Sequence, residues 1–97
     1  MSIQLFLLKS GEYIIADGKE LISNQKPVGY LLDNPEKVTF NSSVFFSEEE
    51  ESEVKISLSP WIILTTDTKI TIPFDWVVTV VEPIESIKKI YNNGKDN

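Results

Sequence analysis

With 97 residues, the chain is long enough for one modest hydrophobic core and too short for two, which predicts a single domain over residues 1–97. It contains no histidine and no cysteine, and this excludes Ser/His/Asp catalysis, disulfides and most transition-metal sites. All nine basic residues are lysines and the formal net charge is −6, so charge argues against a nucleic-acid partner. We therefore expect no enzymatic activity, no cofactor and no metal.

Short stretches with the alternation of β-strands follow one another between turn signals. The first, Ile3–Leu8, has neither the preceding positive charge nor the following cleavage site of a signal peptide, so we expect a strand and, by default, a cytoplasmic protein. The later expected strands are Tyr13–Ala16, Val28–Leu32 with its continuation Val38–Phe40, Val54–Leu58, Lys69–Ile72 and Val77–Val81. The turn signals between them include Asp17-Gly18, Asn24 to Pro27, Asp33-Asn34-Pro35 and Pro73. No apolar run approaches the ~20 residues of a membrane span, so no membrane partner is expected.

The most informative segment is the last expected strand, Val77–Val81, in which Thr79 is the only polar residue. Such a strand is apolar on both faces, so water must be kept from both sides of it. Either the rest of the domain or a second copy of the chain must cover it. The pattern therefore indicates a homo-oligomer as one of two solutions.

Only the end of the chain has helical spacing. Pro83 stands at a plausible start, Ile84, Ile87 and Tyr91 share one face, and Asn92-Asn93-Gly94 is a stop signal. We expect a helix over about residues 84–92 and a disordered tail over 93–97. Many short strands followed by one small helix predict a mainly β fold, in which the sheet curves into a small barrel to hide one apolar face.

Several groups of residues are candidate sites, each with a structural alternative. The acidic stretch 47–53 could hold a hard cation or face a basic partner, but without the spacing of a calcium loop we expect a solvated loop and assign no metal. Asp33 and Asn34 could present polar groups to a ligand, or could form a turn ahead of Pro35. The aromatic residues could form a platform for bases or fill the core and a subunit interface; they are Phe45, Phe46, Trp61, Phe74 and Trp76. Lys88-Lys89 could contact phosphates or complement the helix dipole.

A series of motifs covers almost the whole chain. It consists of Leu7-Leu8-Lys9-Ser10-Gly11-Glu12-Tyr13-Ile14-Ile15-Ala16-Asp17, Tyr30-Leu31-Leu32-Asp33-Asn34-Pro35, Ser59-Pro60-Trp61, residues 70–83 and Tyr91. This series resembles a group of small Sm-like proteins of marine phages (cyanophages). The Sm-like pattern ends in a strand that reaches Ile-Pro, a tight turn and a short Val/Ile strand, to which Ile72-Pro73 and Val77–Val81 correspond.

The resemblance implies a strongly bent, five-stranded barrel of the Sm-like (SH3) type whose last strand pairs with the fourth-strand edge of a neighbour until a ring closes. The implied interface residues are Val77, Val78, Val80 and Val81 on one side and Ile56 and Leu58 on the other. Sm-like rings commonly bind single-stranded RNA, which makes Asp33, Asn34, Phe74, Asp75 and Trp76 the corresponding ligand-loop candidates. The turn Phe74-Asp75-Trp76 is acidic where the family is basic, so a ring would focus negative potential that opposes phosphate entry.

Two functions follow as hypotheses. One is a non-enzymatic, ring-forming Sm-like module of phage origin, located in the host cytoplasm, that binds RNA as the family does. The other is a structural or protein-interaction oligomer without nucleic-acid binding, which the acidity and the absence of arginine favour.

Overall fold

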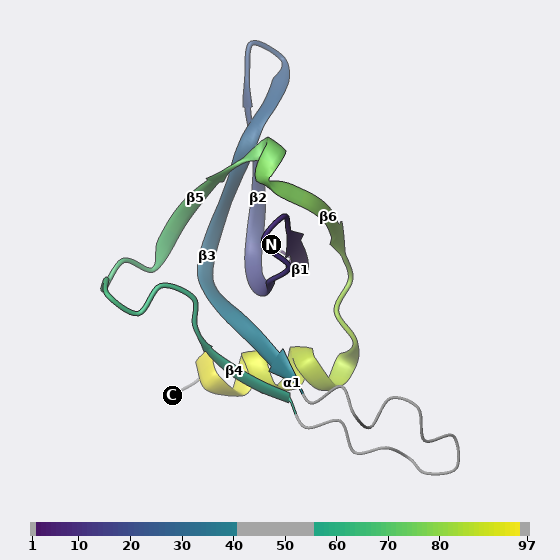
Figure 1. Cartoon of the computed structure of the whole chain (residues 1–97), viewed down its shortest axis with the longest axis vertical. Helices are drawn as coiled ribbons and strands as arrows, with labels where there is room; N and C mark the ends of the chain where they lie inside the picture. The colour runs from purple at the N-terminus through teal and green to yellow at the C-terminus, as the bar shows by residue number, and fades with distance from the viewer. Residues whose placement is uncertain (1, 41–55, 96–97) are drawn as a thin grey trace.

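The computed structural model of the chain describes residues 2–40 and 56–95 (Figure 1). The elements in chain order are β1 (Ile3–Leu8), β2 (Tyr13–Ser23), β3 (Lys26–Phe40), β4 (Ile56–Pro60), β5 (Lys69–Pro73), the single-turn 3-10 helix η2 (Phe74–Trp76), β6 (Val77–Val81) and α1 (Glu85–Lys95). The fold is mainly β with one C-terminal helix, as the alternation of the sequence predicts. The acidic stretch 47–53 and the aromatic pair Phe45 and Phe46 lie outside the described residues.

All six strands belong to one antiparallel sheet with the order β4-β3-β2-β1-β6, and β5 also pairs with β3. The long strand β3 has two partners on the same side, since Gly29–Asp33 pair with β5 and Glu36–Phe40 pair with β4. The five-stranded barrel that the resemblance implied is corrected here: the described sheet has six strands, as many as the sequence pattern predicts, and it is not closed, because β6 pairs with β1 but with neither β4 nor β5. The additional strand exists because β3 is long enough to carry two short partners end to end.

The β2–β3 hairpin is longer than its sequence predicts. The chain reverses at Asn24 and Gln25, whose φ angles of 54° and 66° are those of a two-residue hairpin turn. By contrast, the expected turn at Asp17-Gly18 is wrong, because both residues lie inside β2. Gly18 is required there for space, since a Cβ atom at this position would lie 2.5 Å from Cζ of the buried Phe6. In Figure 1 the tip of this hairpin projects beyond the rest of the sheet.

The segment Asp33-Asn34-Pro35 bends β3 and does not reverse the chain, so the expectation of a turn between two strands is wrong. Ile15 pairs with Glu36 and Asp17 with Asp33, so β3 has one more residue than β2 in this interval. This extra residue is a β-bulge, and Asn34 accommodates it with a φ angle of 54°. The bulge bends β3 at the point where its partner changes from β5 to β4.

Both faces of the sheet are covered, and each has its own hydrophobic core. On one face Phe6, Leu8 and Ile14 pack with Leu32 and Ile72. On the opposite face Ile15 and Val38 pack against Ile87 and Tyr91 of α1, with Ile56 and Leu58 of β4 at the border of this cluster. The two-sided apolar character of the strands therefore has a tertiary explanation, because the helix covers the second face.

Helix α1 follows the buried Pro83 closely but ends later than the stop signal predicts. Asn92, Asn93 and Gly94 lie within α1, which runs to Lys95, so the expected helix of about residues 84–92 is too short at its end. The expectation of a disordered tail is wrong for residues 93–95, and residues 96–97 lie outside the described part. The packing of Ile87 and Tyr91 against the sheet stabilises the helix beyond its weak local signals.

Candidate functional site

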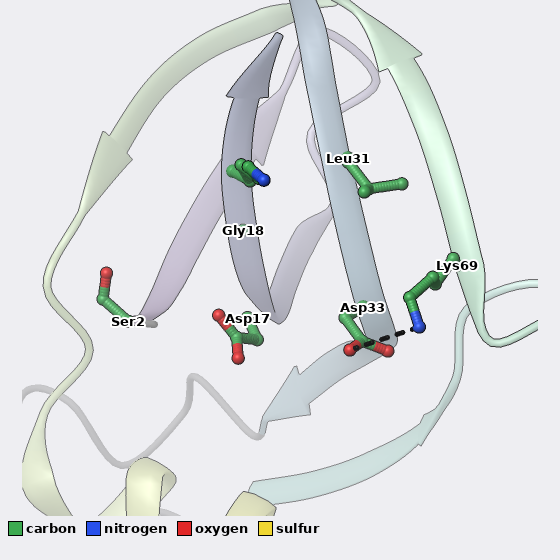
Figure 2. Close-up of a pocket in the computed structure, with 7 residues that line it drawn as sticks. Ser2, Asp17, Gly18, Leu31, Asp33 and Lys69 are labelled. Carbon is green, nitrogen blue, oxygen red and sulfur yellow. Dashed lines mark ion pairs between the residues drawn. The ribbon is translucent and has the colours of Figure 1, made fainter.

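The bend of β3 borders a hollow of about 470 Å³, here named the bend pocket. Its lining residues are Ser2, Asp17, Gly18, Lys19, Leu31, Asp33 and Lys69. The pairing register places Asp17 of β2 directly opposite Asp33 of β3, and Asp33 in turn opposite Lys69 of β5. Figure 2 shows the two carboxylates side by side, with the ammonium group of Lys69 beyond Asp33.

The two carboxylates of the bend pocket differ in their partners. Oδ2 of Asp33 lies 4.0 Å from Nζ of Lys69, and Oδ1 accepts a hydrogen bond of 3.3 Å from Nδ2 of Asn34. Within residues 2–40 and 56–95, the carboxylate of Asp17 has no ion pair or side-chain hydrogen bond. Like charges directly opposite each other destabilise a strand pair, and an exposed ion pair such as Asp33 with Lys69 contributes little.

The charges of the bend pocket balance, because two aspartates face two lysines. Nowhere in the described part do three or more Asp or Glu side chains converge in a way that could hold a metal ion. The pocket also contains the hydroxyl group of Ser2. It is therefore a polar hollow suited to hydrogen bonding, and its charge pattern favours neither a free cation nor a phosphate.

The main chain at the bend is held by Tyr91 of α1. Its hydroxyl group donates to the carbonyl oxygens of Asp33 and Asn34, both 3.0 Å away. Burial raises the pKa of Tyr91 to about 12, and the negative charges of Glu36, Asp17 and Asp33 act in the same direction. The phenol of Tyr91 is therefore neutral near pH 7 and remains a hydrogen-bond donor. Burial also raises the pKa of Glu36.

The expected ligand loop is divided between the two ends of β5. Asp33 pairs with Lys69 at the start of β5, whereas η2 follows Pro73, which pairs with Gly29 at the other end. Four residues along a strand correspond to about 13 Å, so Asp33 and Asn34 do not share a site with Phe74, Asp75 and Trp76. Sequence position alone did not show this separation, because it depends on the register between β3 and β5.

The η2 turn exposes aromatic surface. The ring of Phe74 stacks on Tyr30 with centroids 5.8 Å apart, and Tyr30 meets the buried Phe6 edge to face at 5.3 Å. Burial raises the pKa of Tyr30, and the charge of Glu20 adds to this effect. Phe74, Asp75 and Trp76 are all exposed. The turn thus presents aromatic rings beside a carboxylate, without a basic residue of its own.

The six expected interface residues fall into two groups. Val77 and Val80 pack against the core around Phe6 and Leu8, and Ile56 and Leu58 pack beside α1. Val78 and Val81 remain 58% and 47% exposed. On β6, the difference between the inward valines and the exposed valines involves a bulge. Leu7 pairs with Thr79 and Leu8 with Val77, which leaves Val78 as the additional residue.

Two features were not assigned a role from the sequence. The first is Tyr91, which was recognised as part of the apolar helix face and of the motif series but was given no hydrogen-bonding role. The second is the loop of residues 61–68, whose apolar residues Ile62, Ile63 and Leu64 are exposed. Three consecutive large apolar residues directly after Ser59-Pro60-Trp61 were the available signal, but such a run is equally typical of a buried strand.

Comparison with known proteins adds no assignment to this geometry. Among residues 2–40 and 56–95, no helix has the length and apolar character needed to cross a bilayer. No protein-family model matches the chain, and no curated protein matches it.

Proposed function

We propose that the protein is a non-enzymatic, Sm-like module that assembles through the edges of its sheet into a closed ring and binds a protein partner. The Sm-like part rests on the resemblance stated above, which includes its phage origin. It is supported by the chain order of the elements: strands β1 to β4 are followed by β5, which ends at Ile72-Pro73, then by a single 3-10 turn and a short valine strand that pairs with β1.

The observation that carries the proposal is the outer edge of β6. This edge pairs with no strand in the described part of the chain, and Val77–Val81 contains neither a charged residue nor a proline. Soluble proteins normally protect such edges with charges, prolines or covering segments, because an unprotected edge pairs with other chains. The exposed side chains of Val78 and Val81 add apolar surface at the same place. A second strand is the simplest cover for this edge.

The opposite end of the sheet supplies a complementary edge. There, β4 and β5 each pair with β3 on one side, and neither has a further partner among the described strands. In Figure 1, β5 and β6 lie on opposite flanks of the molecule. Pairing of β6 with β4 or β5 of the next copy would be a head-to-tail contact, which must close into a ring if it is not to grow into a filament.

A protein partner is favoured over RNA by the charges. The chain has a net charge of −6 and no arginine, and η2 places Asp75 between its exposed aromatic residues. Phosphate binding depends on neutralisation by basic side chains, so each added subunit would increase the repulsion of a polyanion. RNA binding is the second candidate, and its support is the resemblance together with the exposed rings of Phe74 and Trp76.

Light scattering coupled to size-exclusion chromatography tests the assembly. We expect the wild type to elute at a multiple of 11.0 kDa. The variant Val78→Lys introduces a charge at an exposed edge position and should elute as a folded monomer with an unchanged circular dichroism spectrum. Asn92→Lys adds the same charge on the exposed side of α1 and should remain oligomeric. A wild type that is monomeric at every concentration would reject the proposal.

Binding of oligo(U) and oligo(A) at two salt concentrations separates the two partner classes. We expect no binding even at low salt. Affinity that falls steeply with added salt would establish RNA binding and reject the protein-partner version, because such a slope reports phosphate contacts.

A further inference from the structure

The bend pocket lies on a part of the sheet face that helix α1 leaves open. Gly18 faces the core around Phe6, because a Cβ atom at this position would lie 2.5 Å from Cζ of that ring. Side chains alternate along a strand, so Asp17 and Lys19 lie on the opposite face, which α1 covers one step earlier in β2, at Ile15. None of the described residues of α1 lines the pocket. The two charged side chains of β2 therefore border a hollow that the rest of the chain does not fill.

The strand register gives the pocket an acidic end and a basic end. Asp17 lies opposite Asp33, and two positions further along β2 Lys19 lies opposite Leu31. Two residues of a strand correspond to about 7 Å, so the paired carboxylates lie about 7 Å along the strands from the ammonium-bearing and aliphatic side chains. The pairing is regular over this interval, since Gly18 pairs with Leu32. One end thus offers acceptors, and the other offers a donor beside an apolar side chain.

Each end of the bend pocket retains one charge without a partner. At the acidic end only Asp33 has an ion pair, a contact of 4.0 Å with Lys69. Among residues 2–40 and 56–95, neither Asp17 nor Lys19 takes part in an ion pair. The acidic end therefore has an excess of one negative charge and the basic end an excess of one positive charge. Because like charges that face each other destabilise a strand pair, a cationic group between the two carboxylates would stabilise this part of the sheet.

The separation of these charges determines the kind of ligand. A simple cation satisfies Asp17 and leaves Lys19 unpaired, and a simple anion does the reverse. A zwitterion satisfies both. Charge-assisted hydrogen bonds are about 2.8 Å long, so a molecule that carries its ammonium and carboxylate groups on one carbon atom bridges an interval of about 7 Å with one such bond at each end. The volume of about 470 Å³ lies within the range of roughly 300–1,000 Å³ that is typical of small-molecule sites.

We propose that the bend pocket binds a free α-amino acid with an aliphatic side chain. The ammonium group of the ligand lies between the carboxylates of Asp17 and Asp33, and its carboxylate accepts from the ammonium group of Lys19. Its side chain packs along Leu31, the apolar member of the lining. All of these residues belong to one chain, so the inference goes beyond the proposed assembly and does not depend on it.

Isothermal titration calorimetry of the full chain with L-leucine tests the site. We expect saturable binding of one L-leucine per chain. N-acetyl-L-leucine lacks the ammonium group and L-leucinamide lacks the carboxylate, so each should bind at least tenfold more weakly. No saturable binding of L-leucine at millimolar concentration would overturn the inference. L-leucinamide that binds as tightly as L-leucine would also overturn it, because the site would then recognise an amine, such as the first residue of a peptide.

Substitution of the two unpaired groups tests their roles. Asp17→Asn and Lys19→Gln should each lower the affinity for L-leucine at least tenfold, while circular dichroism shows that the variants remain folded. Asp75→Asn and Lys89→Gln make the same changes in charge at exposed positions outside the pocket and should leave the affinity unchanged. Equal losses in the pocket variants and in their controls would contradict the inference, because the effect would then come from net charge alone.

The preference among the three ligands reports the orientation of the amino acid. The Asp17→Asn variant should no longer prefer L-leucine to N-acetyl-L-leucine, and the Lys19→Gln variant should no longer prefer it to L-leucinamide. Variants that lose affinity but keep these preferences would overturn the assigned contacts. Light scattering of the same samples keeps the two proposals apart, since a monomer that binds L-leucine would reject the ring alone and an oligomer that does not bind it would reject the amino-acid site alone.

Discussion

The hydroxyl group of Tyr91, on the C-terminal helix, lies 3.0 Å from the carbonyl oxygen of Asn34, where β3 bends. The β-bulge disrupts the pairing of β3 with β2 at this point, so the carbonyl groups of Asp33 and Asn34 need another donor. The hydroxyl group of Tyr91 is this donor, although Tyr91 lies 57 positions after Asn34 in the sequence. The side chain of Tyr91 is itself fully buried. The bend and the helix therefore stabilise each other.

Replacement of Tyr91 by Phe should lower the free energy of unfolding by about 1–3 kcal/mol, because buried carbonyl groups would lose their donor while the ring stays in place. Urea denaturation followed by circular dichroism measures the change. Tyr13→Phe is the matched control, since Tyr13 is only half-buried and its ring packs against Phe40. Equal effects of the two substitutions would show that the hydrogen bonds of Tyr91 contribute nothing.

Stability should fall as the pH rises from about 10 to about 12. The pKa of Tyr91 is raised to about 12 in the folded chain, mainly by burial, whereas an unfolded tyrosine titrates near 10. In this interval the folded state retains a proton that the unfolded state has released, so the free energy of unfolding decreases with pH, in total by roughly 2 kcal/mol.

The difference between wild type and Tyr91→Phe isolates this effect, because lysines and the other tyrosines titrate in the same range in both proteins. Urea midpoints measured at intervals from pH 9 to pH 12 should decline more steeply for the wild type. Parallel curves would mean that Tyr91 ionises in the folded protein as readily as in the unfolded chain.

Gly18→Ala should destabilise the fold by about 1–3 kcal/mol, a typical cost of overpacking a core. The new methyl group would lie 2.5 Å from Cζ of Phe6 and 3.0 Å from Oε1 of Gln4, and Phe6 is fully buried. Gly94→Ala is the control, because nothing lies within 4 Å of its Cβ position and Ala favours a helix over Gly by about 0.5–1 kcal/mol. Thermal unfolding should therefore shift in opposite directions, and a stable Gly18→Ala variant would contradict the packing described for Phe6.

Asp17→Asn should raise the stability by about 0.5 kcal/mol, because it removes one of two like charges that face each other across β2 and β3. The gain should shrink in high salt, which screens exposed charges. Asp75→Asn changes the net charge equally at the exposed η2 turn and should have a smaller effect. A loss of stability on Asp17→Asn would reveal a favourable partner of the Asp17 carboxylate.

The local pattern of the sequence was sufficient for several elements. Alternation placed β1, a short apolar run placed β6 with its bounds Val77–Val81, and the signal at Asn24 located the hairpin turn. These features depend on neighbouring residues alone, because side-chain direction in a strand repeats every two residues. The pattern at Asp33-Asn34-Pro35 was recognised as irregular but was assigned to a turn, since a bend and a reversal use the same residues.

By itself, the sequence determined the fold class, the strand that begins at Val77, the helix around Ile87 and the exclusion of histidine and cysteine chemistry. Only the tertiary structure decided that a bulge turns Val77 and Val80 inward while Val78 stays exposed, that Asp33 and η2 lie apart, and that Ile63 and Leu64 face solvent. The reason is physical. Periodicity is a local property of the chain, whereas register, bulges and exposure depend on contacts between residues far apart in sequence.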